Sequence, residues 1–527
     1  MGQHRRRTAR TPLLGGLAQA LGVAHAARRK GAPPADELLD MSFKVGVSRR
    51  DFLRSSAVLG MGALVASTGV SVRAQTRAQA TAPRIAVIGA GISGLNTAYQ
   101  LQKAGYSAVV YEASARIGGR MDSRRDVLVP GLTTEFGAEF INSDHDDMLA
   151  LVDELGLDLI DRQVPSEAGL RPIDYFYEGR MLTHQEIIDL YAPFAGRIEA
   201  DLTRLDENWD ELLPEYDALS ISEYLDQLGM DGLLRTILES AFTYENGSPA
   251  SSQSLLNFLY LMPTSEDGNF EVIGGSDERY KVRGGNQLIP LGLAERLDRD
   301  VQLGHKFEAA RTVSGGCRLT FQTDGGVTDV DADYVVFALP FTLLRHAQLD
   351  LDLPPDLREA IHDFGYGTSA KVMAGMNTRP WRAQGASGYS VSDTPYVGTW
   401  DNSQTIPGDA GGLTMFAGGM EALAFADGTP EEAVARLLPH VERLYPGVID
   451  AYNGNAARAH WPTYQWALAG YSSPRPGQTH LFDVMSEPHD NLLFVGEHTS
   501  ADYWGFMNGA AESGRRAAET LVELLGG

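Results

Sequence analysis

The sequence contains very little cysteine, because Cys317 is the single cysteine among its 527 residues. One thiol cannot form an internal disulfide, and it cannot supply a metal site built from several cysteines. Long hydrophobic runs are also lacking. The best candidate, residues 57–70, is rich in glycine, alanine and serine, whereas a membrane-spanning helix needs about 20 strongly apolar residues. The sequence therefore predicts no disulfide framework and no stable membrane anchor.

Motifs for several kinds of chemistry are missing too. The sequence has no phosphate-binding P-loop, no nucleophile elbow and no internal repeat. His145, His460 and His498 do not have a metal-ligand spacing, and no carboxylate cluster accompanies them. We interpret these histidines as structural or hydrogen-bonding residues and predict no metal site.

Positive charge is scarce and unevenly distributed. The chain has 44 Lys and Arg against 69 Asp and Glu, which gives a net charge of −25. Residues 1–80 hold 13 basic and 4 acidic residues, a net charge of +9, so the remaining residues carry −34. Such an acidic body repels nucleic acid and anionic membranes, and we exclude both as partners.

The basic segment 1–80 has the features of an export signal. Residues 48–53 read Ser-Arg-Arg-Asp-Phe-Leu, the weakly apolar run 57–70 follows, and residues 78–80 read Ala-Gln-Ala. This order resembles a Tat signal peptide, which directs folded proteins to the Tat export machinery. The resemblance implies a periplasmic or extracellular protein. It leaves open whether translation starts at Met1 or Met41, and where the signal is cleaved.

A dinucleotide-binding unit follows directly. Residues 84–88 are a short apolar run typical of a buried parallel strand, and residues 92–102 have a helical pattern that Gly105 ends. Between them lies Gly-Ala-Gly-Ile-Ser-Gly at 89–94, and the second strand, 108–111, ends at Glu112. A glycine turn between strand and helix, with an acid closing the next strand, predicts a dinucleotide site.

Each residue of this unit has a mechanical reason. Gly89 permits the tight turn, Gly91 lets the backbone approach a pyrophosphate, and Gly94 lets the helix pack closely on the strand. The N-terminus of the helix offers free N–H groups to the phosphates. Glu112 is placed to accept hydrogen bonds from the adenosine ribose.

The next segment resembles a known family. Residues 111–120, Tyr-Glu-Ala-Ser-Ala-Arg-Ile-Gly-Gly-Arg, are similar to the signature of the flavin-containing amine oxidases, which include monoamine, polyamine and L-amino-acid oxidases. Further matches recur over residues 83–527, at 135–140, 282–286, 332–340, 491–499 and 506–514. The resemblance implies FAD as cofactor. The residues expected to contact it are Gly89, Gly91, Ser93, Gly94, Glu112, Ala113, Gly119, Arg120, Gly137, Ala138, Phe307, Trp461, Gly496, Glu497, Phe506 and Met507.

The resemblance also implies the domain organisation. We expect an α/β protein with a discontinuous Rossmann-type FAD-binding domain and an α+β substrate-binding domain. The first is assigned to residues 83–140, 280–340 and 485–527, and the second to residues 141–279 and 341–484. Apolar stripes in the second domain indicate core helices, although Phe242, Tyr244 and Phe258 are candidates to line the route to the flavin. A homodimer stays open.

Lys371 is the expected catalytic residue. It lies in an apolar strand pattern at 367–373, and burying an unpaired ammonium group costs several kcal/mol, so its position needs a reason. The segment resembles the family's lysine strand, in which the ammonium group holds a water against the flavin N5. A strand-edge lysine that points to solvent is the alternative.

Aromatic residues near the C-terminus complete the expected site. By resemblance, Trp461 packs against the flavin and Tyr471 forms one wall of an aromatic cage. Phe506 is the candidate for the second wall, and Trp466 and Trp504 are further candidates for substrate contact. In covalent monoamine oxidases a cysteine precedes the cage tyrosine. Here that residue is Gly470, so we predict non-covalent FAD.

Glu139 departs from the family pattern. Many L-amino-acid oxidases carry an arginine near this point, which binds the substrate carboxylate, whereas a glutamate would attract a cationic amine. Either another cation such as Arg171 or Arg283 replaces that arginine, or the substrate lacks an α-carboxylate. A structural role for Glu139 is equally open.

These features predict an oxidase that removes a hydride from the amine-bearing carbon and reduces O2 to H2O2. The favoured substrate is an L-amino acid, which the Gly-Glu-His-Thr form at 496–499 slightly supports. The alternative substrate is a monoamine or polyamine, which Glu139 favours. A flavin desaturase or protoporphyrinogen-type oxidase would share the cofactor motifs without needing Lys371. A non-catalytic flavin-binding partner is the remaining alternative.

Overall fold

A four-stranded parallel sheet organises the cofactor part of the computed structural model, which describes residues 23–24, 82–259 and 277–526. Its strand order is β19-β12-β1-β2, and the strands are β1 (Ile85–Ile88), β2 (Ala108–Tyr111), β12 (Tyr334–Phe337) and β19 (Leu492–Phe494). They are apolar throughout because both faces of the sheet are covered. The expected Tat signal at residues 48–80 lies outside the described residues.

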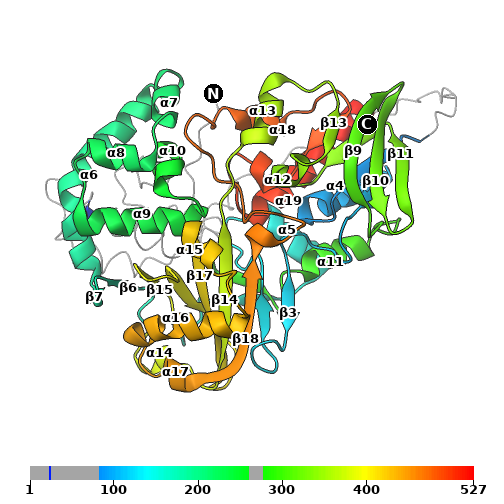
Figure 1. Cartoon of the computed structure of the whole chain (residues 1–527). Helices are drawn as coiled ribbons and strands as arrows, with labels where there is room; N and C mark the ends of the chain where they lie inside the picture. Colours follow the sequence, from blue (N-terminus) through cyan, green and yellow to red (C-terminus); the bar gives the residue numbers. More distant parts are fainter. Residues whose placement is uncertain (1–22, 25–81, 260–276, 527) are drawn as a thin grey trace, which may run out of the picture.

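Helices cover one face of this sheet. They are α4 (Ile92–Lys103), α5 (Asp146–Leu155), α11 (Leu288–Glu295) and α19 (Met507–Leu524). Helices α4 and α19, from opposite ends of the described chain, lie side by side (Figure 1). A Cβ atom at Gly514 would lie 2.3 Å from the carbonyl oxygen of Ser93, so glycine is required for this close approach. The packing brings both helix N-termini to the same region.

A mixed four-stranded layer, antiparallel except for the parallel pairing of its edge strand β13, covers the other face. Its strand order is β11-β10-β9-β13, with β9 (Lys306–Val313), β10 (Gly316–Thr323), β11 (Gly326–Ala332) and β13 (Gln348–Asp350). Cys317 is buried in β10. Short elements complete this part of the molecule: β3 (Ser123–Arg125), β4 (Thr133–Glu135), β5 (Leu159–Asp161), β8 (Tyr280–Val282), α12 (Phe341–Leu344), α13 (Pro355–Asp363), α18 (Leu481–Ser486) and η3 (Glu497–Thr499).

A seven-stranded sheet forms the second part, in the order β18-β14-β17-β16-β15-β6-β7. Its strands are β6 (Asp174–Tyr177), β7 (Arg180–Leu182), β14 (Ser369–Met376), β15 (Ser390–Ser392), β16 (Gly398–Asp401), β17 (Gly411–Gly418) and β18 (Tyr452–His460). Accompanying elements are α14 (Pro380–Ala383), α15 (Gly419–Ala424), α16 (Pro430–Leu444), α17 (Val448–Ala451) and η2 (Trp461–Thr463). Strand β14 is buried along its whole length, and Lys371 pairs there with Phe416 of β17.

A group of helices packs beside this sheet (Figure 1). It contains α6 (His184–Glu207), α7 (Trp209–Asp217), α8 (Ile221–Gln227), α9 (Gly232–Asn246), η1 (Ala250–Ser252) and α10 (Leu255–Leu259). Helices α6 and α8 begin at capping boxes, Thr183 with Glu186 and Ser220 with Glu223, as such sequence patterns predict. Val23 is buried in the same hydrophobic cluster.

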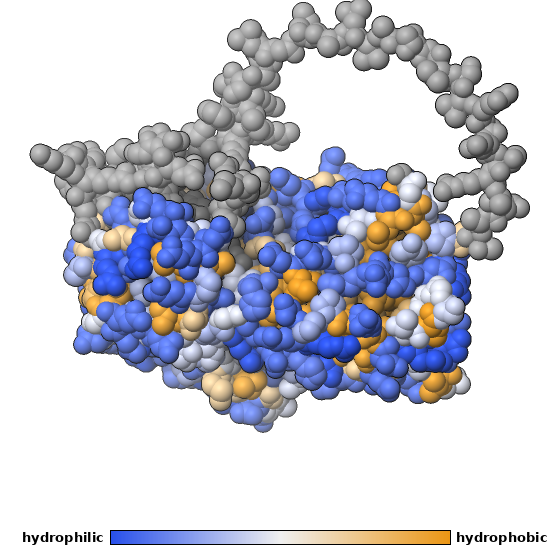
Figure 2. Space-filling view, turned by 90° about the horizontal axis from the view of Figure 1, so that it is seen from above, coloured by the Kyte–Doolittle hydropathy of each residue, from blue (hydrophilic) through white to orange (hydrophobic). Residues whose placement is uncertain are grey.

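The surface is mixed in character. The face in Figure 2 is mainly hydrophilic, and its hydrophobic residues form small separated groups, which is normal for a folded chain. Among the described residues, no helix has the length and apolar character that crossing a membrane requires. A parallel sheet with helices and a second α+β part agree with the predicted fold class.

Candidate active site

A cavity of about 720 Å³ lies between the two parts of the molecule and is lined by residues of both. One end begins at the glycine turn after β1, and the other is enclosed by aromatic residues of the seven-stranded sheet. The predicted residues that line it are Gly89, Gly91, Ser93, Glu112, Ala113, Gly119, Arg120, Gly137, Ala138, Glu139, Phe307, Lys371, Trp461, Trp466, Tyr471, Gly496, Glu497, Phe506 and Met507.

The glycine turn has the geometry that the sequence predicted. Gly89 has φ +111°, and a Cβ atom there would lie 2.5 Å from the carbonyl oxygen of Ala338. A Cβ atom at Gly91 would meet no described atom within 4 Å, so glycine leaves open space there. Gly94 does not line the cavity. Its Cβ would lie 2.1 Å from the Gly89 carbonyl oxygen, so its role is close packing of α4 on the turn.

Glu112 closes the turn at the same end of the cavity. Its two carboxylate oxygens accept hydrogen bonds from the backbone N–H groups of Ala90 at 2.9 Å and Ser114 at 2.8 Å. Phe307 of β9 lines the cavity nearby, where the backbone N–H of His305 donates to the Glu112 carbonyl oxygen. The acid is therefore held by backbone groups and faces the place that a dinucleotide ribose would occupy.

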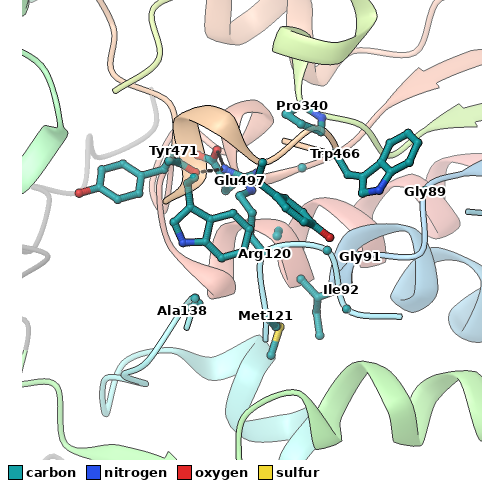
Figure 3. Close-up of a pocket in the computed structure, with 18 of the residues that line it drawn as sticks. Gly89, Gly91, Ile92, Arg120, Met121, Ala138, Pro340, Trp466, Tyr471 and Glu497 are labelled. Atoms are coloured by element: carbon teal, nitrogen blue, oxygen red, sulfur yellow. Dashed lines mark hydrogen bonds and ion pairs between the residues drawn. The ribbon is translucent and has the colours of Figure 1, made fainter. Parts of the chain in front are cut away.

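Arg120 and Glu497 form an ion pair in the middle of the cavity wall (Figure 3). One Arg120 nitrogen, Nη1, donates to Glu497 Oε1 and to the Gly470 carbonyl oxygen, both at 2.8 Å. Burial alone would raise the pKa of Glu497, but Arg120 and the hydroxyl of Ser472, 2.6 Å away, lower it to about 2. The pair ties residues 470–472 to the cofactor part.

Two helix N-termini border the cavity, α4 at Gly91 and α19 at Phe506. Neither has a side chain that caps its N–H groups, and neither has an acidic residue in its first turn. Both therefore offer free N–H donors and partial positive charge. With the open space at Gly91, these residues fit FAD, whose pyrophosphate suits α4 and whose flavin pyrimidine edge suits α19.

Lys371 lies at the other end of the cavity, on the buried strand β14. Its ammonium group donates to the carbonyl oxygens of Glu135 at 3.1 Å and Gly137 at 2.8 Å, and to Glu139 Oε2 at 2.9 Å. It also lies 5.2 Å from the ring centre of Trp400. The lysine is 6% exposed, which excludes the solvent-facing alternative.

Glu139 bridges two lysines. Its Oε1 accepts a hydrogen bond from Lys281 on β8 at 2.9 Å, and its Oε2 accepts the bond from Lys371. Burial alone would raise the pKa of Glu139, but the two ammonium groups outweigh burial and lower it to about 2. The carboxylate is thus ionised, and its charge is already neutralised by the protein.

Aromatic side chains enclose this end. The Tyr471 hydroxyl donates to the Glu245 carbonyl oxygen at 2.8 Å, and Trp461 Nε1 donates to the Phe136 carbonyl oxygen at 3.1 Å. Sequence analysis identified these two but missed most of the enclosing residues, since no motif marks them apart from Phe140, which ends the family match at 135–140. Those are Phe140, Tyr389, Trp400 and Phe416, and they lie in the lining together with Tyr244.

An acid and an arginine meet at the same wall. Glu278 lines the cavity and accepts a hydrogen bond from the Tyr389 hydroxyl at 2.9 Å. Arg162 contacts Glu278 at 3.7 Å from behind, and its guanidinium lies 4.1 Å from the ring centre of Phe140. Burial raises the pKa of Glu278 well above its usual range, although Arg162 opposes the shift.

Several expected contacts are not formed. Trp504 is buried in the hydrophobic cluster around Phe494, outside the cavity lining, because its ring completes the core beneath the parallel sheet. Trp466, in contrast, lines the cavity as expected, although it lies apart from Tyr471 (Figure 3). Phe242 and Phe258 pack against each other in the helical core, at 5.3 Å between ring centres.

Neither arginine proposed to replace the missing carboxylate clamp reaches the cavity. Arg171 pairs with Asp174 at 2.8 Å, and Arg283 is exposed on the turn after β8. Neither residue belongs to the cavity lining.

Comparison with known proteins agrees with this geometry. The model of the flavin containing amine oxidoreductase family matches residues 92–522. A Mycobacterium tuberculosis protein named as a flavin-containing monoamine oxidase, AofH, is 27% identical over 463 residues, covering 84% of this chain and 97% of its own length. An L-amino-acid oxidase of Sistrurus catenatus edwardsii is 23% identical over 472 residues, covering 83% and 86%.

Solved structures are similar as well. A variant of putrescine oxidase superposes with a TM-score of 0.70 at 25% identity, covering 84% of this chain and 99% of that chain. Cyclohexylamine oxidase from Brevibacterium oxydans has a TM-score of 0.71 at 23% identity, covering 85% and 100%, which shows the shared fold. Because the family model spans most of the chain, the protein belongs to the flavin-containing amine oxidoreductases, which are FAD-dependent enzymes.

Proposed function

We propose that this enzyme oxidises amines that carry no carboxylate on the reacting carbon, with non-covalently bound FAD and with O2 as electron acceptor. One observation carries the choice between an amine and an amino acid. Two cations near the aromatic end of the cavity already donate their hydrogen bonds to acceptors of the protein.

Lys371 and Arg162 are these cations. The three protons of the Lys371 ammonium group have three acceptors at 2.8 to 3.1 Å. Each side-chain nitrogen of Arg162 also donates: Nε to Gln404 at 2.8 Å, Nη1 to the Glu278 carbonyl oxygen at 2.7 Å, and Nη2 to Tyr389 at 2.9 Å. A substrate carboxylate would meet Glu139 and Glu278 and, in the described cavity lining at this end, no cation with a hydrogen bond left to donate, which costs several kcal/mol.

The lining residues suit a neutral amine instead. Tyr471, Trp400 and Phe416 offer ring faces and edges that can orient an apolar amine and exclude water. FAD, when bound, accepts the hydride and passes the electrons to O2, and the released imine hydrolyses in water. Because amines are mostly protonated at neutral pH, the rate is expected to rise with pH as the neutral amine becomes available.

Lys371 is proposed as the catalytic residue in reoxidation. Its buried positive charge lines the cavity at the aromatic end and is held by backbone carbonyl groups, so the charge stays in place without solvent rearrangement. A Lys371→Met variant that reacts with O2 at the wild-type rate would contradict this role.

Non-covalent binding of FAD is supported by the position of the thiol. Cys317, the single cysteine of the chain, lies in β10 outside the cavity lining. At the position where covalent relatives carry cysteine, a Cβ atom on Gly470 would lie 2.1 Å from Ser369 Oγ, so a side chain there would require Ser369 to move.

Matched substrate pairs test the proposal directly. Each pair consists of an L-amino acid and its decarboxylated amine, such as phenylalanine with phenethylamine or ornithine with putrescine. The amine of at least one pair is expected to have a kcat/KM about 100-fold or more above that of its amino acid, because the carboxylate loses its solvation without gaining a partner. Peroxide and ammonia are the products to measure.

The L-amino-acid oxidase remains the second candidate, favoured by the Gly-Glu-His-Thr form of residues 496–499. Equal or greater kcat/KM values for the amino acids would establish it. Flavin reduction without release of ammonia from any substrate would instead favour a desaturase or protoporphyrinogen-type oxidase.

A further inference from the structure

Lys281 stands next to the proposed catalytic residue without entering the cavity. It comes from β8, which pairs with β5, whereas Lys371 comes from β14 in the other sheet. The Lys281 ammonium group donates to Glu139 Oε1 at 2.9 Å, and its side chain is 12% exposed. It lies outside the cavity lining, so it cannot touch substrate or flavin itself.

The carboxylate between the two lysines connects them mechanically. Glu139 has one oxygen for each ammonium group, and its side chain is 4% exposed. Within this triad, two ammonium groups against one carboxylate leave an excess of one positive charge. The neighbouring buried carboxyl group of Glu135 has its pKa raised to about 7 by burial. With Lys281 removed, the remaining pair is neutral, and the free oxygen lets the carboxylate rotate.

We infer that Lys281 is a positioning residue, which acts through Glu139 to orient Lys371 and to keep a net positive charge beside the flavin-facing wall. The inference rests on the proposed role of Lys371. It adds a residue from a separate strand that no sequence motif marks. The physical reason is the number of bonds to the Glu139 carboxylate. With both oxygens bonded, the carboxylate holds the Lys371 ammonium group in one direction, whereas with one oxygen bonded it can rotate.

The variants Lys281→Met and Lys281→Arg separate charge from packing. In Lys281→Met the rate constant for flavin reoxidation by O2 is expected to fall about tenfold. The Lys371 ammonium group would be displaced, and it would then stabilise the transition state of reoxidation less. The dissociation constant for substrate should stay unchanged. Lys281→Arg keeps the charge and should restore most of the rate. Lys103→Met is the matched control, since Lys103 forms a surface pair with Glu154 at 2.8 Å.

A second measurement does not depend on turnover. The midpoint potential of the bound flavin is expected to be lower in Lys281→Met than in the wild type. The variant has lost a positive charge that stabilises the reduced flavin. Lys281→Arg and Lys103→Met should keep the wild-type potential. If Lys281→Met folds poorly, Lys281→Gln can replace it in this measurement. Glutamine keeps a hydrogen-bond donor but lacks the charge, so the midpoint potential should again be lower than in the wild type.

The double variant decides between a positioning role and an independent one. If Lys281 acts through Lys371, then Lys281→Met added to Lys371→Met should not lower the reoxidation rate further. Two results would overturn the role of Lys281 while leaving that of Lys371 intact. One is additive losses of rate in the double variant. The other is a wild-type rate and potential in Lys281→Met while Lys371→Met is impaired. A wild-type rate in Lys371→Met would instead overturn the proposed role of that lysine.

Discussion

Replacing Glu139 by glutamine perturbs the charge balance of the site most directly. Its carboxylate lies between the ammonium groups of Lys281 and Lys371, at 2.9 Å from each. Burial would raise its pKa, yet the two lysines lower the pKa from the ordinary 4.5 to about 2. At about 1.4 kcal/mol for each pKa unit, the ionised carboxylate contributes about 3 kcal/mol to folding at neutral pH.

The pH dependence follows from the direction of this shift. A carboxyl group whose pKa is lower in the folded protein stabilises the fold above its unfolded pKa, and this stabilisation is lost as the pH falls toward the folded pKa. Between about pH 6 and pH 3.5 the wild type therefore loses about 1 kcal/mol of stability that Glu139→Gln cannot lose. The stability difference between the wild type and Glu139→Gln is expected to be about 3 kcal/mol at pH 6. At pH 3.5 it should be smaller by the stability that the wild type has lost.

Urea unfolding at both pH values, followed by tryptophan fluorescence, measures this difference. Glu154→Gln is the matched control, because Glu154 pairs with Lys103 on the surface with 35% of its side chain exposed. Such a pair contributes at most about 1 kcal/mol. The reasoning is refuted if Glu139→Gln loses no more stability than Glu154→Gln, or if its deficit is the same at both pH values.

Further predictions concern the cavity, the cofactor and export. Tyr471→Phe removes the hydrogen bond to the Glu245 carbonyl oxygen and should lower kcat/KM about fivefold with FAD content retained. Gly398→Ala places a Cβ 2.3 Å from Tyr244 Cε2, so substrate KM should rise and stability fall by about 1–3 kcal/mol. Gly325→Ala, whose Cβ meets its nearest atom at 3.6 Å, should change neither. Acid precipitation should leave all flavin in the supernatant, and flavin in the pellet would disprove non-covalent binding. Replacing Arg49 and Arg50 by lysine should retain the enzyme in the cytoplasm in cell fractionation, whereas Arg73→Lys should be exported normally.

The dinucleotide unit could be predicted almost residue by residue, because its signal is local. Strand β1, the turn at Gly89 and helix α4 follow one another without interruption. Each has a pattern that depends on its own backbone geometry, such as φ +111° at Gly89. The order of strands in the sheet, β19-β12-β1-β2, was not predicted, because no local pattern determines it.

The aromatic end of the cavity could not be predicted in the same way. Glu278 and Lys281 come from one segment, just before the family match at 282–286, and Trp400 comes from another, but none of the three lies within a motif. Their proximity to Lys371 results from the packing of β8 against β5 and of β14 against β17. A charged residue within an apolar strand pattern was the local signal, and it identified Lys371 alone, whereas Trp461 and Tyr471 came from the family resemblance.

Aromatic residues were also hard to divide between core and cavity. Trp504 and Phe506 are neighbours in sequence, yet Trp504 packs in the core while Phe506 lines the cavity. The turn before α19 points the two rings in different directions, and composition carries no information about that turn. Tyr244 and Phe242 on α9 differ in the same way, because positions two apart on a helix face different sides.

Anaerobic titration of the purified, FAD-containing enzyme tests the central claim most directly. An amine without an α-carboxylate should bleach the visible absorbance of the flavin, and admitting O2 should restore it with peroxide and ammonia formed in equal amounts. The matched L-amino acid should leave the spectrum oxidised over the same time. A preparation that takes up no FAD, or a flavin that the amino acid reduces faster than its amine, would contradict the account.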